Sequence, residues 1–131
     1  MSAESDVLSE FRWCNRILIL GAPDPEDARV RDQLDAIALD PGGMRERDLV
    51  IVCAFERGQS SRDGDPMPQT TARALREQFG IEPETFTVLL VGKDGAEKLR
   101  REAVAPLSDL FEVIDAMPMR QREIREQRRN P

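Results

Sequence analysis

The sequence predicts an α/β domain in which helices lie on both faces of a mixed sheet of four strands. Two apolar runs, residues 16–21 and 48–55, are typical of strands that are buried on both faces. The segment between them carries apolar residues at helical spacing, so the three segments form a β-α-β unit, whose crossover is right-handed. A third apolar run, residues 86–92, is followed by the turn residues 93–95 and another extended segment, which predicts an antiparallel hairpin.

Three segments between and after these strands predict helices. The first is expected over residues 24–39, with Asp24 as its capping residue, and a proline and two glycines end it. The second is expected over residues 71–79, and the third begins at 107 and breaks or kinks at Pro118. The order of elements is β-α-β-α-β-β-α, and a charged C-terminal helix follows.

The organisation of the chain follows from these elements. We divide it into a lead-in over residues 1–15, one folded domain over residues 16–117 and a basic helix or tail over residues 118–131. Residues 56–69 are rich in turn-forming residues and poor in apolar ones, so we expect a mobile surface loop there. We expect residues 120–131 to be removable at little cost in stability, because they contain a single large apolar residue.

The composition excludes several chemistries. Histidine is absent from the 131 residues, so a Ser-His-Asp triad, a Cys-His pair and a histidine-ligated zinc are excluded. The net charge of −6 argues against nucleic-acid binding by the whole surface, since phosphate contacts need basic residues. No calcium-loop or phosphate-loop spacing occurs. We therefore assign no catalytic, cofactor-binding or metal-binding residue and expect no cofactor.

The sequence predicts neither a membrane-spanning segment nor an export signal. No apolar run approaches the roughly 20 residues that cross a bilayer, so we expect no membrane partner. Residues 1–11 lack the basic start and apolar stretch of an export signal. We expect a cytoplasmic protein, or a periplasmic or secreted one if the chain is a mature form.

The two cysteines are expected to be unpaired. Cys53 falls late in the second strand, where buried thiols behave as small hydrophobic groups with a raised pKa. Cys14 precedes the first strand. Because the two strands should run parallel as neighbours, the thiols lie at opposite ends of the sheet, too far apart for a disulfide.

Basic side chains gather on the expected edge strand with its turn, and on the tail. Edge strands use such residues to block unwanted pairing, and the five arginines and two glutamates of residues 120–129 are also typical of a solvated helix. A protein partner is favoured over a nucleic acid, and its identity and the oligomeric state are open. The candidate partner surface comprises Lys93, Lys98, Arg100, Arg120, Arg122 and Arg125.

Several stretches in a fixed order resemble one family. They are NRILILGAP at 15–23, RDLV at 47–50, FTVLLVGKDG at 86–95, KLR at 98–100 and LFEVIDAMPMR at 110–120. They resemble the bacterial DUDES-like domain of unknown function (DUF4174), a family regarded as thioredoxin-like or peroxiredoxin-like. Relatives of that domain occur in extracellular vertebrate proteins of the sushi-repeat and Equarin kind. The resemblance covers nearly the whole chain after Phe11. It implies a thioredoxin-like three-layer fold and no particular reaction; a small flavodoxin-like sheet, the alternative, is disfavoured by the hairpin.

The chain departs from thioredoxins at their reactive position. Thioredoxins carry Cys-x-x-Cys just after the first strand, where the N-terminus of a helix stabilises a thiolate. Residues 24–27 of this chain are Asp-Pro-Glu-Asp. We therefore interpret the chain as a non-catalytic binding or interaction module. The alternative is a residual thiol redox enzyme, such as a one-cysteine peroxidase, that uses Cys53 or Cys14.

Overall fold

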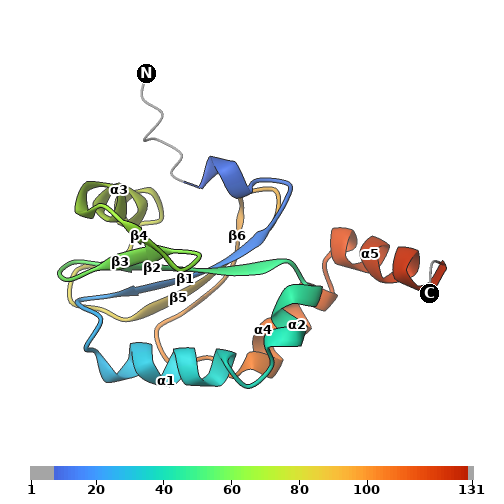
Figure 1. The fold of residues 1–131 in the computed structure, drawn as a ribbon, viewed down its shortest axis with the longest axis horizontal. Helices are drawn as coiled ribbons and strands as arrows, with labels where there is room; N and C mark the ends of the chain where they lie inside the picture. Colours follow the sequence, from blue (N-terminus) through green and yellow to red (C-terminus); the bar gives the residue numbers. More distant parts are fainter. Residues whose placement is uncertain (1–7, 130–131) are drawn as a thin grey trace.

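The structure is a computed structural model that describes residues 8–129, and its centre is a mixed sheet in the strand order β4-β3-β2-β1-β5-β6 (Figure 1). The central strand β1 (Arg16–Ala22) runs parallel to β2 (Leu49–Phe55) and antiparallel to β5 (Thr87–Val91). Strand β6 (Glu97–Arg101) pairs with β5 and forms one edge. Every residue of β1 is buried, as the unbroken apolar run predicts for a strand that is covered on both faces.

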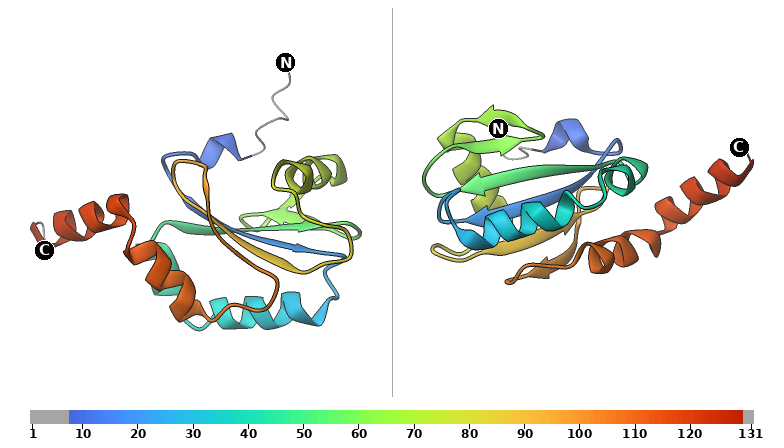
Figure 2. Two further views of the ribbon diagram at one scale, coloured as in Figure 1. Left: turned by 180° about the vertical axis from the view of Figure 1, so that it is seen from behind. Right: turned by 60° about the horizontal axis from the view of Figure 1, so that its bottom comes forward.

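Helices cover the two faces of the sheet and complete three layers (Figures 1 and 2). Helices α1 (Ala28–Ile37), α2 (Pro41–Glu46) and α4 (Leu107–Asp115) enclose one core, which contains the alternate β1 residues Leu18 and Leu20. On the other face, α3 (Gln69–Gln78) encloses a second core. A one-turn 3-10 helix, Ser9–Phe11, precedes β1. This arrangement confirms the predicted three-layer α/β fold.

The expected loop over residues 56–69 is a hairpin instead, and it raises the number of strands from four to six. Strands β3 (Ser60–Arg62) and β4 (Asp65–Met67) flank Asp63 and Gly64, whose φ angles of 53° and 88° are those of a two-residue hairpin turn. Strand β3 pairs with β2 and extends the sheet. The segment has few apolar residues because it lies at an edge, where Met67 alone supplies a large buried side chain.

The first predicted helix is divided and begins later than expected. The side chain of Asp24 accepts a hydrogen bond from the main-chain N–H of Glu26 at 2.9 Å, so residues 24–27 form a turn and α1 begins at Ala28. Asp40 caps the separate helix α2 by accepting from Gly43 N at 2.9 Å, and Pro41 starts that helix. A Cβ atom at position 43 would lie 2.7 Å from the Phe111 ring, which explains the glycine.

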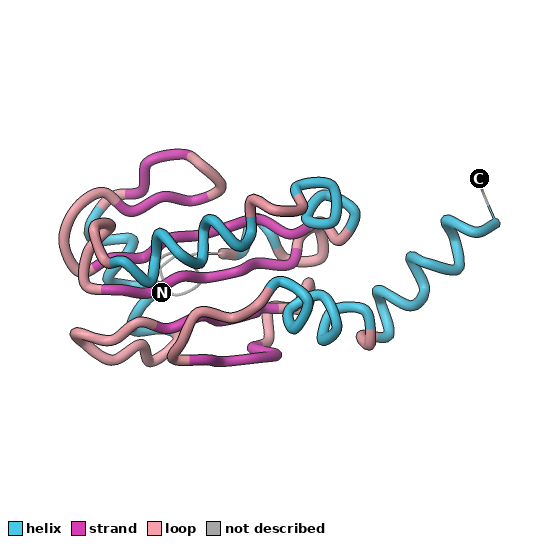
Figure 3. Tube along the Cα trace, turned by 90° about the horizontal axis from the view of Figure 1, so that it is seen from below, coloured by secondary structure: helices cyan, strands magenta, loops and turns pink. Residues whose placement is uncertain are grey.

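The last helix, α5 (Pro118–Arg129), projects from the body of the domain (Figure 3). Pro118 is its first residue, a position where the missing N–H is tolerated, and α4 ends at Asp115. Within residues 8–129, no helix has both the length and the apolar character that a membrane span requires.

The β3-β4 hairpin provides a stability test. The buried hydroxyl of Ser60 accepts a hydrogen bond from the main-chain N–H of Phe55 at 2.9 Å. We expect Ser60→Ala to lower the free energy of unfolding by about 1–3 kcal/mol, because the N–H loses its buried partner. Urea denaturation measures this change. The control, Ser108→Ala on the exposed side of α4, should shift the value by less than about 0.5 kcal/mol; equal shifts in both variants would contradict the role of Ser60.

Candidate functional site

The N-terminus of α1, where thioredoxins hold their reactive thiols, is closed by a carboxylate of this chain. Oδ1 of Asp27 accepts from Arg29 N at 2.9 Å, and Oδ2 pairs with Nη2 of Arg29 at 2.7 Å. The hydrogen bond from the Arg29 side chain lowers the pKa of Asp27. The positive end of the helix is thus already satisfied by an ionised group.

The nearby ends of β1 and β2 are bound by a buried cation. Arg76 of α3 donates from Nη1 to the carbonyls of Ala54 at 3.1 Å and Ala22 at 3.4 Å, and from Nη2 to Glu82 O at 3.0 Å. Burial lowers the pKa of Arg76. A pocket of about 390 Å³ lies beside this guanidinium. The main-chain carbonyls of Ala22 and Ala54 at this end of the sheet therefore accept hydrogen bonds from Arg76.

The two thiols lie far apart and both are free. Cys53 is buried in β2 opposite Leu20, and burial raises its pKa, as predicted. Cys14 is exposed and precedes β1. Cys53 pairs with Leu20, which lies four residues along β1 from Arg16, or roughly 13 Å, and Cys14 precedes Arg16. An intramolecular disulfide is excluded by this distance.

A network of charged side chains joins α5 to the end of the sheet where β1 begins. Arg16, the first residue of β1, has an exposed fraction of 1%, and its two terminal nitrogens each donate to a carboxylate oxygen of Glu123 at 3.2 Å. Nη1 of Arg16 also donates to the carbonyl of Arg47 at 2.9 Å. Nζ of Lys93 contacts Glu123 at 2.7 Å and Asp48 at 2.9 Å.

The network continues from α5 to α2 and α4. Arg120, with an exposed fraction of 3%, contacts Asp115 at 3.1 Å and Glu46 at 3.4 Å. Arg47 contacts the same Asp115 at 2.9 Å and stacks 3.8 Å from the centre of the Phe111 ring. We call this network the ion cluster: Arg16, Glu46, Arg47, Asp48, Lys93, Asp115, Arg120 and Glu123.

The ion cluster lowers the pKa of two of its carboxylates, Glu123 and Asp115. Burial alone would raise the pKa of Glu123, but the hydrogen bonds from Lys93 and Arg16 outweigh it and the pKa is lowered. Asp115 behaves in the same way, with Arg47 and Arg120 as its partners. Both groups therefore stay ionised at neutral pH.

The ion cluster changes the expectation for the tail. Arg120 is buried and Glu123 neutralises a buried cation, so the start of α5 is part of the folded structure. We no longer expect residues 120–131 to be removable at little cost, because their removal would leave Arg16 without its carboxylate. Sequence reasoning missed this because Arg16 stands at the beginning of an apolar run, where a charged residue suggests that the strand starts in water.

The structure separates the six candidate surface residues into two groups. Lys93 and Arg120 are buried within the ion cluster and do not face a partner. The remaining four are exposed, although Lys98 pairs with Asp94 at 3.0 Å and Arg100 pairs with Glu97 at 2.8 Å.

The exposed arginines of α5 form one face of the helix. At about 100° per residue they fall within roughly 120° of the helix circumference, on the side opposite Arg120 and Glu123. Glu126 lies at the border of this face. We call it the arginine face: Arg122, Arg125, Arg128 and Arg129.

The fold is thioredoxin-like and peroxiredoxin-like. Reduced 2-Cys peroxiredoxin from Plasmodium vivax superposes with a TM-score of 0.64 at 9% identity, covering 88% of this chain and 84% of that one. Thioredoxin peroxidase I from Plasmodium yoelii gives 0.62 at 11% identity, covering 88% and 79%. At these identities the likeness shows the fold alone.

The family itself is shown by sequence. The domain of unknown function DUF4174 matches residues 7–123, so the chain belongs to this family, as its motifs predicted. The match ends at Glu123; three of the four face arginines lie beyond it.

Two vertebrate proteins are similar over most of this chain. Coiled-coil domain-containing protein 80 of Danio rerio is 28% identical over 139 residues, which cover 89% of this chain and 15% of that protein. Sushi repeat-containing protein SRPX of Rattus norvegicus and of Homo sapiens is 27% identical over 121 residues, covering 90% and 26%. The chain thus spans about a quarter or less of the length of these relatives.

The ion cluster predicts how stability depends on pH. The lowered pKa of Glu123 means that its contribution is present above the ordinary value of 4.5 and is lost as pH falls through the folded-state value. At pH 7 we expect Glu123→Gln to lower the free energy of unfolding by about 1–3 kcal/mol, less than for a fully buried pair because Glu123 is 23% exposed. Denaturation at pH 7 and pH 3 should show this difference shrinking in acid.

The control for this measurement is Glu112→Gln, an exposed glutamate on α4. It should leave stability nearly unchanged at both pH values. A Glu123→Gln variant as stable as the parent at pH 7 would show that the ion cluster does not anchor α5.

The cysteines give a further test. At neutral pH we expect Cys14 to be alkylated at the rate of an ordinary exposed thiol, and Cys53 far more slowly until the protein is unfolded, because Cys53 is buried and its pKa is raised. Mass spectrometry of peptides after timed alkylation follows each thiol separately. If either thiol reacts far faster than a free cysteine, or reduces peroxide, the redox alternative is supported.

Proposed function

We propose that this domain is a non-catalytic protein-binding module that presents the arginine face of α5 to an acidic segment of a partner. The observation that carries the proposal is the division of α5 into two sides. One side is fixed to the sheet by the ion cluster, and the other holds the exposed arginines. A helix anchored in this way presents its charges at low entropic cost, which favours binding.

The closed N-terminus of α1 and the buried position of Cys53 support a binding role over thiol chemistry. A reactive thiol needs a nearby cation or a free helix N-terminus to form a thiolate. Asp27 already closes the N-terminus of α1, and Cys53 lies inside the core with a raised pKa. The arginine face of α5 offers exposed charged side chains for recognition instead.

Charge complementarity favours an acidic protein segment over a nucleic acid. The whole chain has a net charge of −6, so a long polyanion that extends beyond α5 meets repulsion from the domain. The arginine face is short, because Arg122 and Arg129 are separated by about 10 Å along the helix axis. A few acidic side chains suffice to span it.

Matched charge variants test the proposal. The probe is a fluorescein-labelled peptide of about 12 residues that consists mainly of glutamate, and fluorescence anisotropy measures its affinity at low salt. We expect replacement of all four face arginines by glutamine to weaken binding about tenfold, since each exposed ion pair contributes roughly 0.3–0.5 kcal/mol. Circular dichroism confirms that α5 stays helical.

The control removes the same number of charges elsewhere. Glutamine at the exposed positions Arg31, Arg45, Arg73 and Arg101 should change affinity less than about threefold, since these residues lie outside α5 and act only through the net charge. If both variants lose the same amount of affinity, the effect is one of net charge alone and the proposal is refuted. Tighter binding of a single-stranded oligonucleotide of equal charge would favour a nucleic-acid partner instead.

A further inference from the structure

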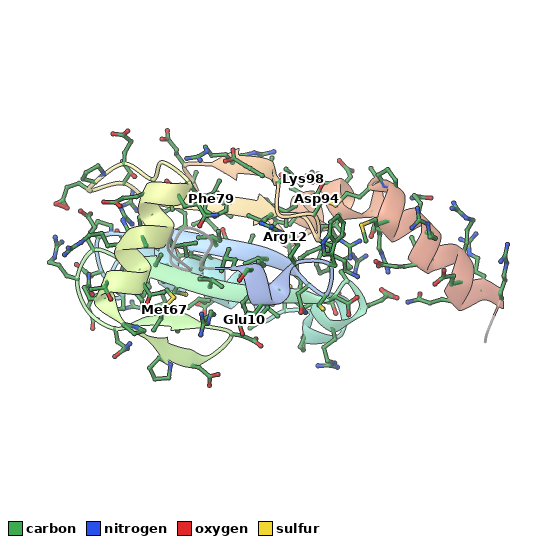
Figure 4. All side chains as sticks on the ribbon, turned by 90° about the horizontal axis from the view of Figure 1, so that it is seen from above. Glu10, Arg12, Met67, Phe79, Asp94 and Lys98 are labelled. Atoms are coloured by element: carbon green, nitrogen blue, oxygen red, sulfur yellow. The ribbon has the colours of Figure 1, made fainter. Side chains whose placement is uncertain are left out.

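The pocket of about 390 Å³ beside Arg76 lies at the end of the sheet away from α5. Its walls come from α3, the end of β2 and the segment 80–83 that follows α3. Figure 4 shows how α3 crosses above the sheet, with Met67 just before its start and Phe79 at its end. The volume falls within the roughly 300–1,000 Å³ that is typical of small-molecule sites.

Arg76 gives this pocket a buried positive charge that is only partly compensated. Its exposed fraction is 7%, and both Nη atoms donate to main-chain carbonyls, which carry no net charge. Oε1 of Glu56 is 3.9 Å from Nη2, too far for a hydrogen bond, and already accepts from Glu84 N at 2.8 Å. Within residues 8–129, Nε of Arg76 has no hydrogen-bond partner, and it is not fully buried. A carboxylate supplied by a ligand would complete the compensation.

Three other charged side chains line the pocket without partners of their own. Arg73, Glu77 and Glu82 are exposed, and their side chains make no ion pair or hydrogen bond with the part of the chain that the structure describes. Arg73 and Glu77 lie one turn apart on α3, where opposite charges often pair, yet they do not. The pocket therefore offers unpaired groups of both signs, which suit a ligand that carries both charges.

An apolar wall lies among these charged groups. Phe55, Ile81 and Pro83 line the pocket, and the first two are buried. The wall is held by the turn that ends α3, in which Gly80 has a φ of 61° and the N–H of Ile81 donates to the carbonyl of Arg76 at 2.9 Å. The apolar surface is thus formed before any ligand arrives.

We propose that this pocket binds a free amino acid with an apolar side chain. The carboxylate of the amino acid pairs with Arg73 and Arg76, and its ammonium group pairs with Glu77 and Glu82. The side chain packs on the apolar wall. This activity goes beyond the proposed function and uses none of the residues of α5. An acidic peptide segment is not favoured here, because three of the five charged residues that line the pocket are glutamates.

Leucine and two of its derivatives test the proposal by isothermal titration calorimetry. N-acetyl-leucine lacks the ammonium group, and leucinamide lacks the carboxylate. We expect leucine to bind about tenfold more tightly than either derivative, because each derivative loses one set of charge-assisted hydrogen bonds. Glycine should also bind about tenfold more weakly than leucine, because it has no apolar side chain to bury.

Two variants assign the two charged groups of the ligand. Arg73→Gln should weaken the binding of leucine about tenfold and leave leucinamide unaffected, because leucinamide has no carboxylate. Glu77→Gln should weaken leucine and leucinamide and leave N-acetyl-leucine unaffected. The controls, Arg31→Gln on α1 and Glu112→Gln on α4, change exposed charges outside the pocket and should retain the parental affinity. Circular dichroism checks that all four variants are folded.

Each other outcome overturns the proposal. If N-acetyl-leucine binds as tightly as leucine, the pocket is a simple anion site, and if leucinamide does so, it is a simple cation site. If leucine does not bind at millimolar concentration, or if the controls lose as much affinity as the pocket variants, the pocket is not an amino-acid site. The affinity for the glutamate peptide is measured separately and depends on α5, so these outcomes leave the proposed function untouched.

Discussion

The guanidinium of Arg16 is held at the start of the central strand by both carboxylate oxygens of Glu123, and much of the domain depends on this pair. A charge with 1% exposure is tolerated only when a counter-charge and good hydrogen bonds compensate for lost solvation. The counter-charge comes from α5, so burial of the first residue of β1 is coupled to the docking of this helix. Lys93 shares the same carboxylate and thereby connects β5 to the same end of the sheet.

The likeness to the peroxiredoxins concerns the fold, while the side chains at the two ends of the sheet are particular to this chain. The fold superposes on those of the Plasmodium proteins, and in this chain the end of the sheet where β1 and β2 terminate is occupied by Arg76 and by the cap of α1. The other end of the sheet, where β1 begins, carries the ion cluster and the arginine face. The chemistry of a fold is determined by side chains at such edges, and they can change without altering the core.

The elements that the sequence predicts best are those that bury the most apolar surface. The unbroken apolar runs of β1, β2 and β5 predict central strands. Gly95, with a φ of 86°, makes the turn between β5 and β6. The β3-β4 hairpin was missed because main-chain pairing, one serine hydroxyl and the single buried side chain of Met67 leave no apolar pattern in the sequence. The sequence signal for this hairpin is the dipeptide Asp63-Gly64, which favours a two-residue hairpin turn.

The candidate site was harder to predict for a physical reason. Exposed and buried arginines look alike in a sequence, and only the partner distinguishes them. Arg120 and Arg122 are two residues apart, yet one is buried against Asp115 and the other is exposed, because successive helix positions differ by about 100° in direction. The carboxylates that select Arg120 come from α2 and α4, which no local pattern connects to the tail.

The distance along the chain between Arg16 and Glu123 has a consequence for how the protein is made. The two residues are 107 positions apart, so at a synthesis rate of about 5–20 residues per second Arg16 is translated roughly 5–20 s before its partner. During that interval the central strand carries an uncompensated charge at the edge of the growing core. The sheet can pair earlier, but the nascent domain becomes electrostatically complete only when the start of α5 has emerged from the ribosome.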